Sequence, residues 1–349
     1  MELKTFGGVE VKVRNGTVGK GNKKRILTRE DELLAQKIAV CLNLKQPILI
    51  EGESGLGKTE MIDFISEECQ WPLSYLNCHD MEPDQIMGSK TLDNSTKSGF
   101  GYKAGALPIG IEEGHLTILD EYNFIRGETR AVLTEPLDAL LRKKTQVKNT
   151  FNDGRMIPVH KNFRLIALQN PPGGVYGNRE VLDPPQLSRF VHLRLNDMSK
   201  EQKISRTHGE FGIKIPAFRK QDKIIATGDW DQFDDIAQVK LYIKKYVEFS
   251  VEFDELVKIR EIGSTYEQPI YTSFQREFDR VKQFMFQYPQ EDLTKTFVKA
   301  VSFYYFNKIT TTQDKILLKA LISKHFEGGE SGGTQSEDCE SENDSKEDV

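Results

Sequence analysis

Short apolar runs alternate with helical patterns over the first 200 residues of the chain. Residues 47–50 (PILI), 116–121 (LTILDE) and 163–172 (FRLIALQNPP) are typical of strands buried on both faces of a sheet. Residues 28–44 carry apolar positions at helical spacing, and Thr28 precedes acidic residues, which predicts a helix start there. Strands that alternate with helices predict an α/β fold with a mainly parallel central sheet.

The pattern differs toward the two ends of the chain. Valines alternate with charged residues over residues 9–14, and Asn15-Gly16, a favoured hairpin turn, follows them. A β-hairpin and a basic linker are therefore expected in residues 1–27, ahead of an α/β domain over residues 28–200. After about residue 200 only helical periods are compelling, which predicts an α-helical domain over residues 201–326.

The charge is distributed unevenly along the chain. The net charge is −5, yet the last 23 residues hold nine acids and one lysine, a net charge of −8. The other 326 residues therefore carry a net charge of about +3. Residues 327–349 contain almost no apolar side chains to bury, so we expect a disordered acidic tail.

Composition narrows the cellular setting. The chain contains no run of about 18 apolar residues, and its first residues lack the basic and apolar blocks of a secretory signal. Its four cysteines form no CxxC pair, which favours a reducing compartment and gives no cysteine metal site. We therefore expect a cytoplasmic protein with no membrane partner.

Residues 52–59 (GESGLGKT) fit the phosphate-binding pattern G-x-x-x-x-G-K-[ST], between an apolar strand and a helical pattern. Glycines let the backbone turn its N–H groups onto phosphate oxygens, and the following helix adds its positive end. Lys58 is expected to reach the β- and γ-phosphates, and Thr59 to bind Mg²⁺. The expected nucleotide-binding residues are Gly52, Glu53, Ser54, Gly55, Leu56, Gly57, Lys58 and Thr59.

Polar residues follow the other two predicted strands. Asp120 at the end of one strand is suited to hold Mg²⁺, and Glu121 to act as the general base for an attacking water. The third strand ends in Gln169-Asn170, where an amide can orient that water. Asn-Pro-Pro-Gly-Gly is also turn chemistry by itself, and both interpretations can hold together.

These motifs, with their order and spacing over about residues 30–200, resemble an AAA+ ATPase. The segments GESGLGKTE, GYKAGALPIGIEEGHLTILDEYNF and VHKNFRLIALQNPPGGVYGNREVLDPPQLSRFVHLRL look, more narrowly, like the MoxR, midasin and dynein-related branch. Residues 77–89 resemble the segment that this branch carries before its helix-2 insertion, and residues 95–108 would then be that insertion and the strand after it.

The resemblance implies further roles. Asn170 corresponds to sensor 1, and Arg189 falls where this family places an arginine finger that acts on a neighbouring subunit. A finger in trans implies a homo-oligomeric ring, typically a hexamer. Residues 201–326 would form the lid, with Arg276 as the sensor 2 residue. Gln275 occupies the position where the family has this arginine, so the choice between the two remains open.

The favoured function is a ring-forming ATPase, with ATP and Mg²⁺ as cofactors, that remodels a protein partner in a chaperone-like way. The resemblance implies a von Willebrand A-domain protein as a partner encoded separately. A nucleic-acid motor is the alternative, because residues 20–25 (KGNKKR) and 142–148 (RKKTQVK) are basic. ATP is inferred from the family, and a GTP-using relative exists in the restriction-related part of the branch.

Overall fold

The protein is described by a computed structural model, which covers residues 2–14, 27–93, 95, 97, 99–171, 182–210, 236–266, 270, 272–288 and 293–327. The chain divides into two compact units, residues 1–234 with 266–279 and residues 235–265 with 280–349. The predicted turn at Asn15-Gly16, the basic residues 20–25 and the acidic tail after Glu327 lie outside the described residues.

The first unit is built on a parallel sheet of five strands: β3 (Ile48–Glu51), β4 (Leu73–Asn77), β7 (Leu116–Asp120), β10 (Arg164–Gln169) and β11 (Val191–Arg194). The strands lie in the order β11-β3-β10-β7-β4, and every neighbouring pair is parallel. This confirms the predicted α/β class and three strands predicted from apolar runs. Strands β4 and β11 were not predicted from their patterns, because each is short and carries polar residues.

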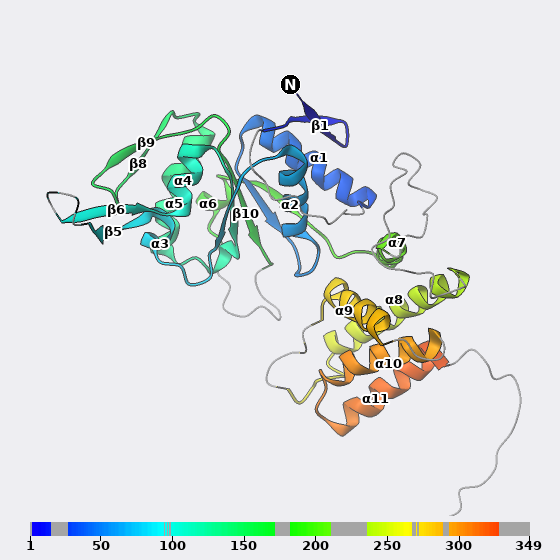
Figure 1. Ribbon diagram of the computed structural model, residues 1–349. Helices are drawn as coiled ribbons and strands as arrows, with labels where there is room; N and C mark the ends of the chain where they lie inside the picture. The colour runs from blue at the N-terminus through cyan, green and yellow to red at the C-terminus, as the bar shows by residue number, and fades with distance from the viewer. Residues whose placement is uncertain are drawn as a thin grey trace, which may run out of the picture. The chain divides into compact units, whose positions relative to one another are not determined.

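Alternate residues of each central strand enter two different cores. Ile48, Ile118 and Ile166 pack on one face with helices α1 (Arg29–Leu44) and α2 (Lys58–Cys69). Leu49 and Leu119 pack on the other face with α3 (Pro83–Met87), α4 (Ala106–Glu113) and α5 (Gly127–Leu141). Figure 1 shows these two helical layers on either side of the sheet. A strand apolar at every position is therefore explained by two-sided burial.

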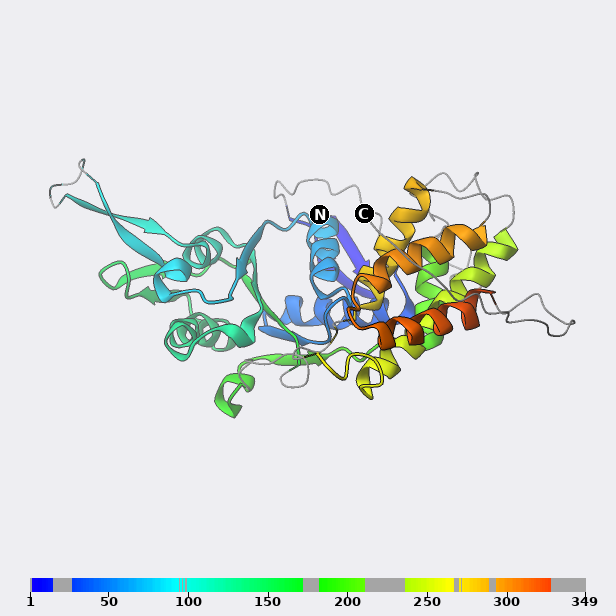
Figure 2. The ribbon, with the colours of Figure 1, turned by 90° about the horizontal axis from the view of Figure 1, so that it is seen from below.

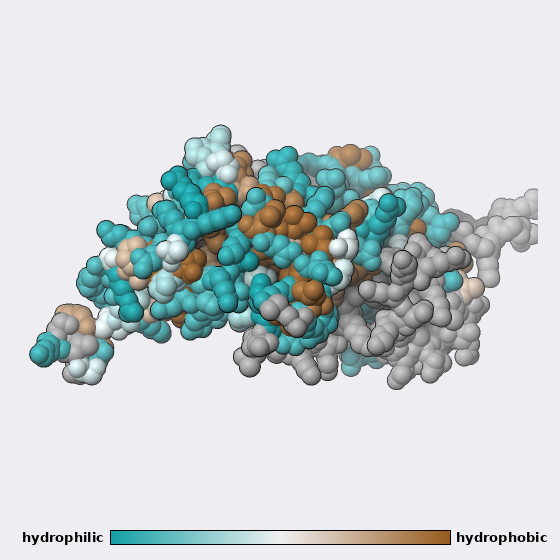
Figure 3. All heavy atoms as spheres, turned by 90° about the horizontal axis from the view of Figure 1, so that it is seen from above, coloured by the Kyte–Doolittle hydropathy of each residue, from teal (hydrophilic) through white to brown (hydrophobic). Residues whose placement is uncertain are grey.

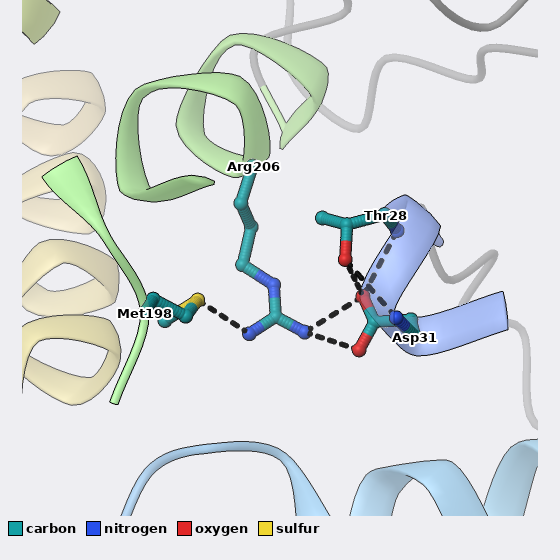
Figure 4. Close-up of polar contacts among 4 residues, drawn as sticks. All are labelled: Thr28, Asp31, Met198 and Arg206. Atoms are coloured by element: carbon teal, nitrogen blue, oxygen red, sulfur yellow. Dashed lines mark hydrogen bonds and ion pairs between the residues drawn. The ribbon is translucent and has the colours of Figure 1, made fainter. Parts of the chain in front are cut away.

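Helix α1 begins where the sequence predicts. Thr28 and Asp31 form a reciprocal capping box, with Asp31 N–H donating to Thr28 Oγ1 at 3.2 Å and Thr28 N–H to the Asp31 carboxylate at 2.9 Å. Arg206, on α7 (Lys200–Glu210), donates to both oxygens of that carboxylate at 3.2 and 3.1 Å, as Figure 4 shows. Both side chains are nearly buried, so this ion pair fixes α7 against the start of α1.

Three β-hairpins accompany the sheet. Strands β1 (Leu3–Phe6) and β2 (Val9–Lys12) pair around Gly7-Gly8, so the turn of the described N-terminal hairpin is not the predicted Asn15-Gly16. Both glycines have positive φ, which suits a tight turn. Strands β5 (Gly88–Leu92) and β6 (Phe100–Ala104) form a hairpin that projects from the unit in Figures 1 and 2. The third joins β8 (Gln146–Asn149) to β9 (Arg155–Pro158).

The described part of the second unit is helical, as its periodicity predicts. It comprises α8 (Ile236–Lys258), the later part of α9 (Phe274–Gln287), α10 (Leu293–Phe306), α11 (Thr312–Ile322) and a π-helical turn (Ser323–Glu327). Its core is aromatic: the Phe249 ring lies 4.9 Å from the Tyr305 ring and 5.7 Å from the Phe326 ring. Among the described helices, none has the length and apolar character that crossing a membrane requires.

Candidate nucleotide site

Residues 52–57 form the loop that connects β3 to α2, and three positions of this loop require glycine. Gly55 and Gly57 have φ values of +85° and +76°, which favour glycine. A Cβ on Gly52 would lie 2.8 Å from the Leu195 Cβ, closer than real Cβ atoms come. The backbone of this loop therefore turns tightly, as a loop that surrounds a phosphate group must.

The first turn of α2 brings backbone N–H donors to the end of this loop. Gly57 is the N-cap residue and supplies no side-chain cap. The first N–H groups of a helix have no partner within the helix, so they can bind an anion, aided by the helix dipole. Lys58 and Thr59 occupy this first turn, which puts a cation and a hydroxyl beside the same donors.

The Lys58 ammonium group is held at the mouth of the loop. It is 8% exposed and donates to the carbonyl oxygens of Gly52 at 2.6 Å and Glu53 at 2.9 Å. It also donates to Asn170 Oδ1 at 2.7 Å. The lysine is thereby linked to a residue 112 positions later in the chain.

Asn170 connects the loop lysine to the acidic strand end. Its Nδ2 donates to Glu121 Oε1 at 3.3 Å, and its carbonyl oxygen accepts a bond from Asn123 Nδ2 at 2.9 Å. The sheet order explains this geometry, because β10 lies between β3 and β7. Lys58, Asn170 and Glu121 therefore form one hydrogen-bonded chain across the carboxyl ends of three adjacent strands.

Asp120 is positioned by two donors. The Glu121 backbone N–H donates to Oδ1 at 2.9 Å, and the Tyr75 hydroxyl of β4 donates to Oδ2. Burial, together with the hydrogen bond to Asp120 and its negative charge, raises the pKa of Tyr75 above its ordinary value, so the hydroxyl keeps its proton. Glu121 itself has φ +54°, a conformation that non-glycine residues rarely adopt, and it turns the chain sharply after β7.

These residues fit a magnesium nucleotide. The glycine cradle, the N–H groups at the start of α2 and the Lys58 ammonium group provide an electropositive environment for phosphate oxygens. Mg²⁺ usually takes one or two protein ligands and completes its shell with phosphate and water. Thr59 at the first turn of α2 and the Asp120 carboxylate are ligand types that Mg²⁺ accepts, and the remaining capacity of Asp120 is not consumed by its two donors.

The predicted sensor 2 region also reaches the loop within the first unit. Ser273 is buried, its Oγ donates to the Ser54 carbonyl at 3.4 Å, and a Cβ on Gly55 would lie 2.2 Å from it. The same Cβ would lie 4.0 Å from the Gln275 Cβ, whereas Arg276 is exposed. Because α9 turns about 100° per residue, these neighbours face different directions. The geometry favours Gln275 over Arg276 as the residue beside the loop.

Arg189 is held by its own chain. It follows α6 (Pro184–Leu187), with Nε 3.1 Å from Asp138 Oδ1 of α5 and a terminal nitrogen donating to the Pro185 carbonyl at 2.6 Å. No contact between Arg189 and residues 52–59 occurs in the described part of the chain. The arginine therefore does not join the Lys58–Asn170–Glu121 chain of its own subunit.

Three residues of the site were not predicted from the sequence: Tyr75, Asn123 and Ser273. Tyr75 lies in a strand too short to show a clear period, and its partner Asp120 is 45 positions away. Asn123 follows Glu121 by two positions within the 3₁₀ helix η1 (Tyr122–Phe124), so nearness to the predicted base was the available signal. Ser273 is 219 positions from Ser54, and no local pattern reports that contact.

A known protein family matches the part of the chain that contains most of these residues. Residues 47–190 match the family of AAA domains of the dynein-related subfamily. Residues 47–190 are therefore an AAA domain of the AAA+ ATPases, in the MoxR, midasin and dynein-related branch. Membership of this family implies nucleotide binding. The match begins one residue before β3 and ends one residue after Arg189.

The relatives are similar over this domain. Midasin from Giardia intestinalis is 30% identical over 178 residues, which are 51% of this chain and 4% of that protein. Midasin from Dictyostelium discoideum is 28% identical over 203 residues, 55% of this chain and 3% of that protein. The uncharacterized protein YojN of Bacillus subtilis is 28% identical over 143 residues, 40% of this chain and 45% of that protein. The chain thus spans less than half of each of these relatives.

A crystal structure from Cytophaga hutchinsonii, described only provisionally as an ATPase, aligns with 86% of this chain and 82% of that one. The sequence identity is 15% and the TM-score is 0.40, which is too low to assign a fold or a function to this chain.

Proposed function

We propose that this protein hydrolyses ATP in the presence of Mg²⁺, as a subunit of a ring that remodels a protein partner. The observation that carries the proposal is the hydrogen-bonded chain Lys58–Asn170–Glu121 at the carboxyl edge of the sheet. It brings the phosphate cation, a polar amide and a carboxylate base together, which is the set that hydrolysis of a γ-phosphate requires.

Each residue then has a distinct task. Lys58 binds the β- and γ-phosphates, while Thr59 and Asp120 hold Mg²⁺, which supplies charge neutralisation at the phosphates when bound. Glu121 accepts the proton of the attacking water, and Asn170 orients Glu121 through its 3.3 Å hydrogen bond. Tyr75 fixes the carboxylate of Asp120 through its hydroxyl.

Arg189 is proposed to act on a neighbouring subunit. A guanidinium placed at the γ-phosphate stabilises charge in the transition state. Within its own subunit, the Arg189 guanidinium contacts Asp138 instead. The likeness to AAA+ proteins of this branch supports our proposal of a hexameric ring in the cytoplasm. The proposed partner is a von Willebrand A-domain protein that is encoded separately. Residues 201–326 are the proposed lid of the domain formed by residues 28–200.

The test compares two variants that should fail in different ways. Lys58→Ala removes the phosphate cation, so we expect loss of most nucleotide binding. Glu121→Gln keeps the shape of the site and removes the base, so it should bind ATP and hydrolyse it about 10²- to 10⁴-fold more slowly. Binding is measured with a fluorescent ATP analogue, and hydrolysis by phosphate release with and without Mg²⁺.

Two results would decide against the proposal. Hydrolysis by Glu121→Gln at the parent rate would exclude Glu121 as the base. Parallel assays with GTP test the choice of nucleotide, because turnover of GTP in preference to ATP would place the protein with the restriction-related relatives.

A further inference from the structure

A second polar site lies at the opposite, amino edge of the sheet. A cavity of about 440 Å³ opens between the carboxyl end of α1, the carboxyl end of α5 and the segment that joins β9 to β10. Aliphatic side chains form part of its wall, including Leu44, Leu140 and Val159. This volume is within the range of sites that accept a small ligand or one anchoring side chain.

The charged groups of this cavity are all of one sign. Four lysines and a histidine line it, and no carboxylate is among the described lining residues. The five groups are Lys45, Lys143, Lys144, His160 and Lys161. Within the described part of the chain these lysines form no ion pair, whereas Lys90 pairs with Asp153 at 2.8 Å and Lys324 with Glu252 at 2.6 Å.

The positive charges act on one another. Burial, followed by the charges of Arg164 and Lys143, lowers the pKa of Lys45 below its ordinary value. Burial and the charge of Lys161 lower the pKa of His160 in the same direction. The smaller, charge-dependent part of each pKa shift reflects repulsion that an anion in the cavity would relieve.

Helix stability explains only part of this cluster. Cations are favoured at helix carboxyl ends, where Lys45 caps α1 and Lys143 follows α5. Both, however, have positive φ values, 61° and 54°, at positions where glycine is the usual residue. Lys144 and Lys161 are exposed and are not needed to cap either helix. Helix capping therefore does not account for Lys144 and Lys161.

An apolar stripe leads away from the cavity along α1. Leu33, Val40 and Leu44 are 47%, 40% and 58% exposed, and their spacing of seven and four residues places them on one face of the helix. Leu44 belongs to both the stripe and the cavity wall. The face in Figure 3 carries a group of brown, apolar atoms surrounded by teal ones.

We propose that this cavity binds an acidic peptide segment of a partner protein, with an aliphatic side chain between its carboxylates. The carboxylates would pair with the four lysines, and the aliphatic group would pack against Leu44 and Val159. A nucleic acid fits less well, because single strands are bound by stacking on exposed aromatic rings. Among the described lining residues Phe163 has the one phenyl ring, which is fully buried, and the His160 imidazole is the other aromatic ring.

The cavity lysines of the basic segment 142–148, Lys143 and Lys144, are thus assigned a protein partner rather than a nucleic acid. This inference is independent of the proposed hydrolysis, because the cavity and the nucleotide loop lie at opposite ends of the same strands. The experiment can therefore be made on the full chain without nucleotide.

The probe is a fluorescent peptide of sequence EDLEELDEVE, measured by fluorescence anisotropy at about 50 mM salt, where screening is weak. The test variant is K144E/K161E, which reverses two exposed charges of the cavity. The matched control is K103E/K148E, which reverses two exposed lysines of β6 and β8 outside it. Thermal melts establish that both variants fold.

We expect the cavity variant to bind the peptide about tenfold or more weakly, and the control to stay within about threefold of the parent. A peptide with serine in place of leucine and valine should also bind several-fold more weakly than the original. All three proteins should hydrolyse ATP at equal rates if the parent does, so a failure of the proposed hydrolysis leaves this test intact.

Three results would overturn the inference. The first is no binding of the peptide by the parent protein. The second is an equal loss in cavity and control variants, which would mean non-specific charge attraction. The third is tighter binding of a single-stranded oligonucleotide of equal charge that is lost only in K144E/K161E, which would identify a nucleic-acid site instead.

Discussion

The two edges of the five-stranded sheet differ in how their polar groups are satisfied. At the carboxyl edge, Lys58, Asn170 and Glu121 bond one another, and Asp120 is held by Tyr75. At the amino edge, four lysines surround one cavity and form no ion pair with the described residues. One edge is therefore organised in advance, whereas the other leaves charges for a second molecule to neutralise.

Helix direction accounts for part of this contrast. α2 follows β3 and presents its positive amino end at the carboxyl edge, where phosphates are expected. α1 precedes β3 and ends at the amino edge with Lys45, and α5 is followed by Lys143 at the same edge. The same parallel topology thus provides an anion cradle at one edge and lysine-rich helix ends at the other. Four predictions test whether the two edges are as different as they look.

Arg189→Ala should have the largest effect, a loss of hydrolysis of about 10³-fold or more with ATP binding kept, if the guanidinium acts in trans. Mixing Arg189→Ala with Lys58→Ala subunits should partly restore activity, because some interfaces then pair an intact cradle with a donated arginine. Phosphate release is the measurement, and fluorescent labelling establishes subunit exchange. Arg142→Ala, which removes the other arginine near Asp138, is the control. Exchange without rescue would exclude the finger.

Arg206→Met should lower the free energy of unfolding by about 3–5 kcal/mol, because it leaves the Asp31 carboxylate buried without its cation. Chemical denaturation followed by circular dichroism measures this. The control is Arg194→Met, whose ion pair with Glu51 is 72% exposed on the arginine side and should change stability by less than about 1 kcal/mol. Equal effects would mean that the start of α1 is not anchored by this pair.

Tyr75→Phe removes one hydrogen bond to the Asp120 carboxylate, worth about 1.5 kcal/mol at such a partly exposed group. The concentration of Mg²⁺ that gives half-maximal hydrolysis should therefore rise about tenfold, with ATP affinity in the absence of metal unchanged. Tyr102→Phe deletes a hydroxyl that bonds Met87 and Asn149 away from the site, and should leave the Mg²⁺ dependence unaltered. A parallel shift in both variants would count against a positioning role for Tyr75.

Lys45→Gly should have the smallest effect on folding, a gain in stability of about 1 kcal/mol or less, because glycine adopts the positive φ of this position without strain. The same variant should bind the acidic peptide more weakly. Thermal denaturation and anisotropy measure the two effects. If stability falls and peptide binding is kept, Lys45 serves the helix end rather than the cavity.

The sequence by itself determined the features that depend on neighbouring residues. The glycine spacing of residues 52–59, the apolar strands and the Thr28 cap are all local, and the structure has each of them where it was predicted. Lys58 was a candidate from the phosphate-binding pattern, and Glu121 and Asn170 because they stand at the ends of predicted strands. Parallel strands bring their carboxyl ends to the same edge, so their meeting could be expected from the fold class.

Tertiary structure alone decided the contacts between distant segments. The contacts of Ser273 with Ser54, Tyr75 with Asp120 and Arg206 with Asp31 join residues that are 45 to 219 positions apart. The lysine cavity likewise brings together the end of α1, the end of α5 and the segment between β9 and β10, whose basic residues look unrelated in the sequence. Such contacts depend on strand order, strand register and packing angles. Many weak interactions together determine these features, so no local sequence pattern encodes them.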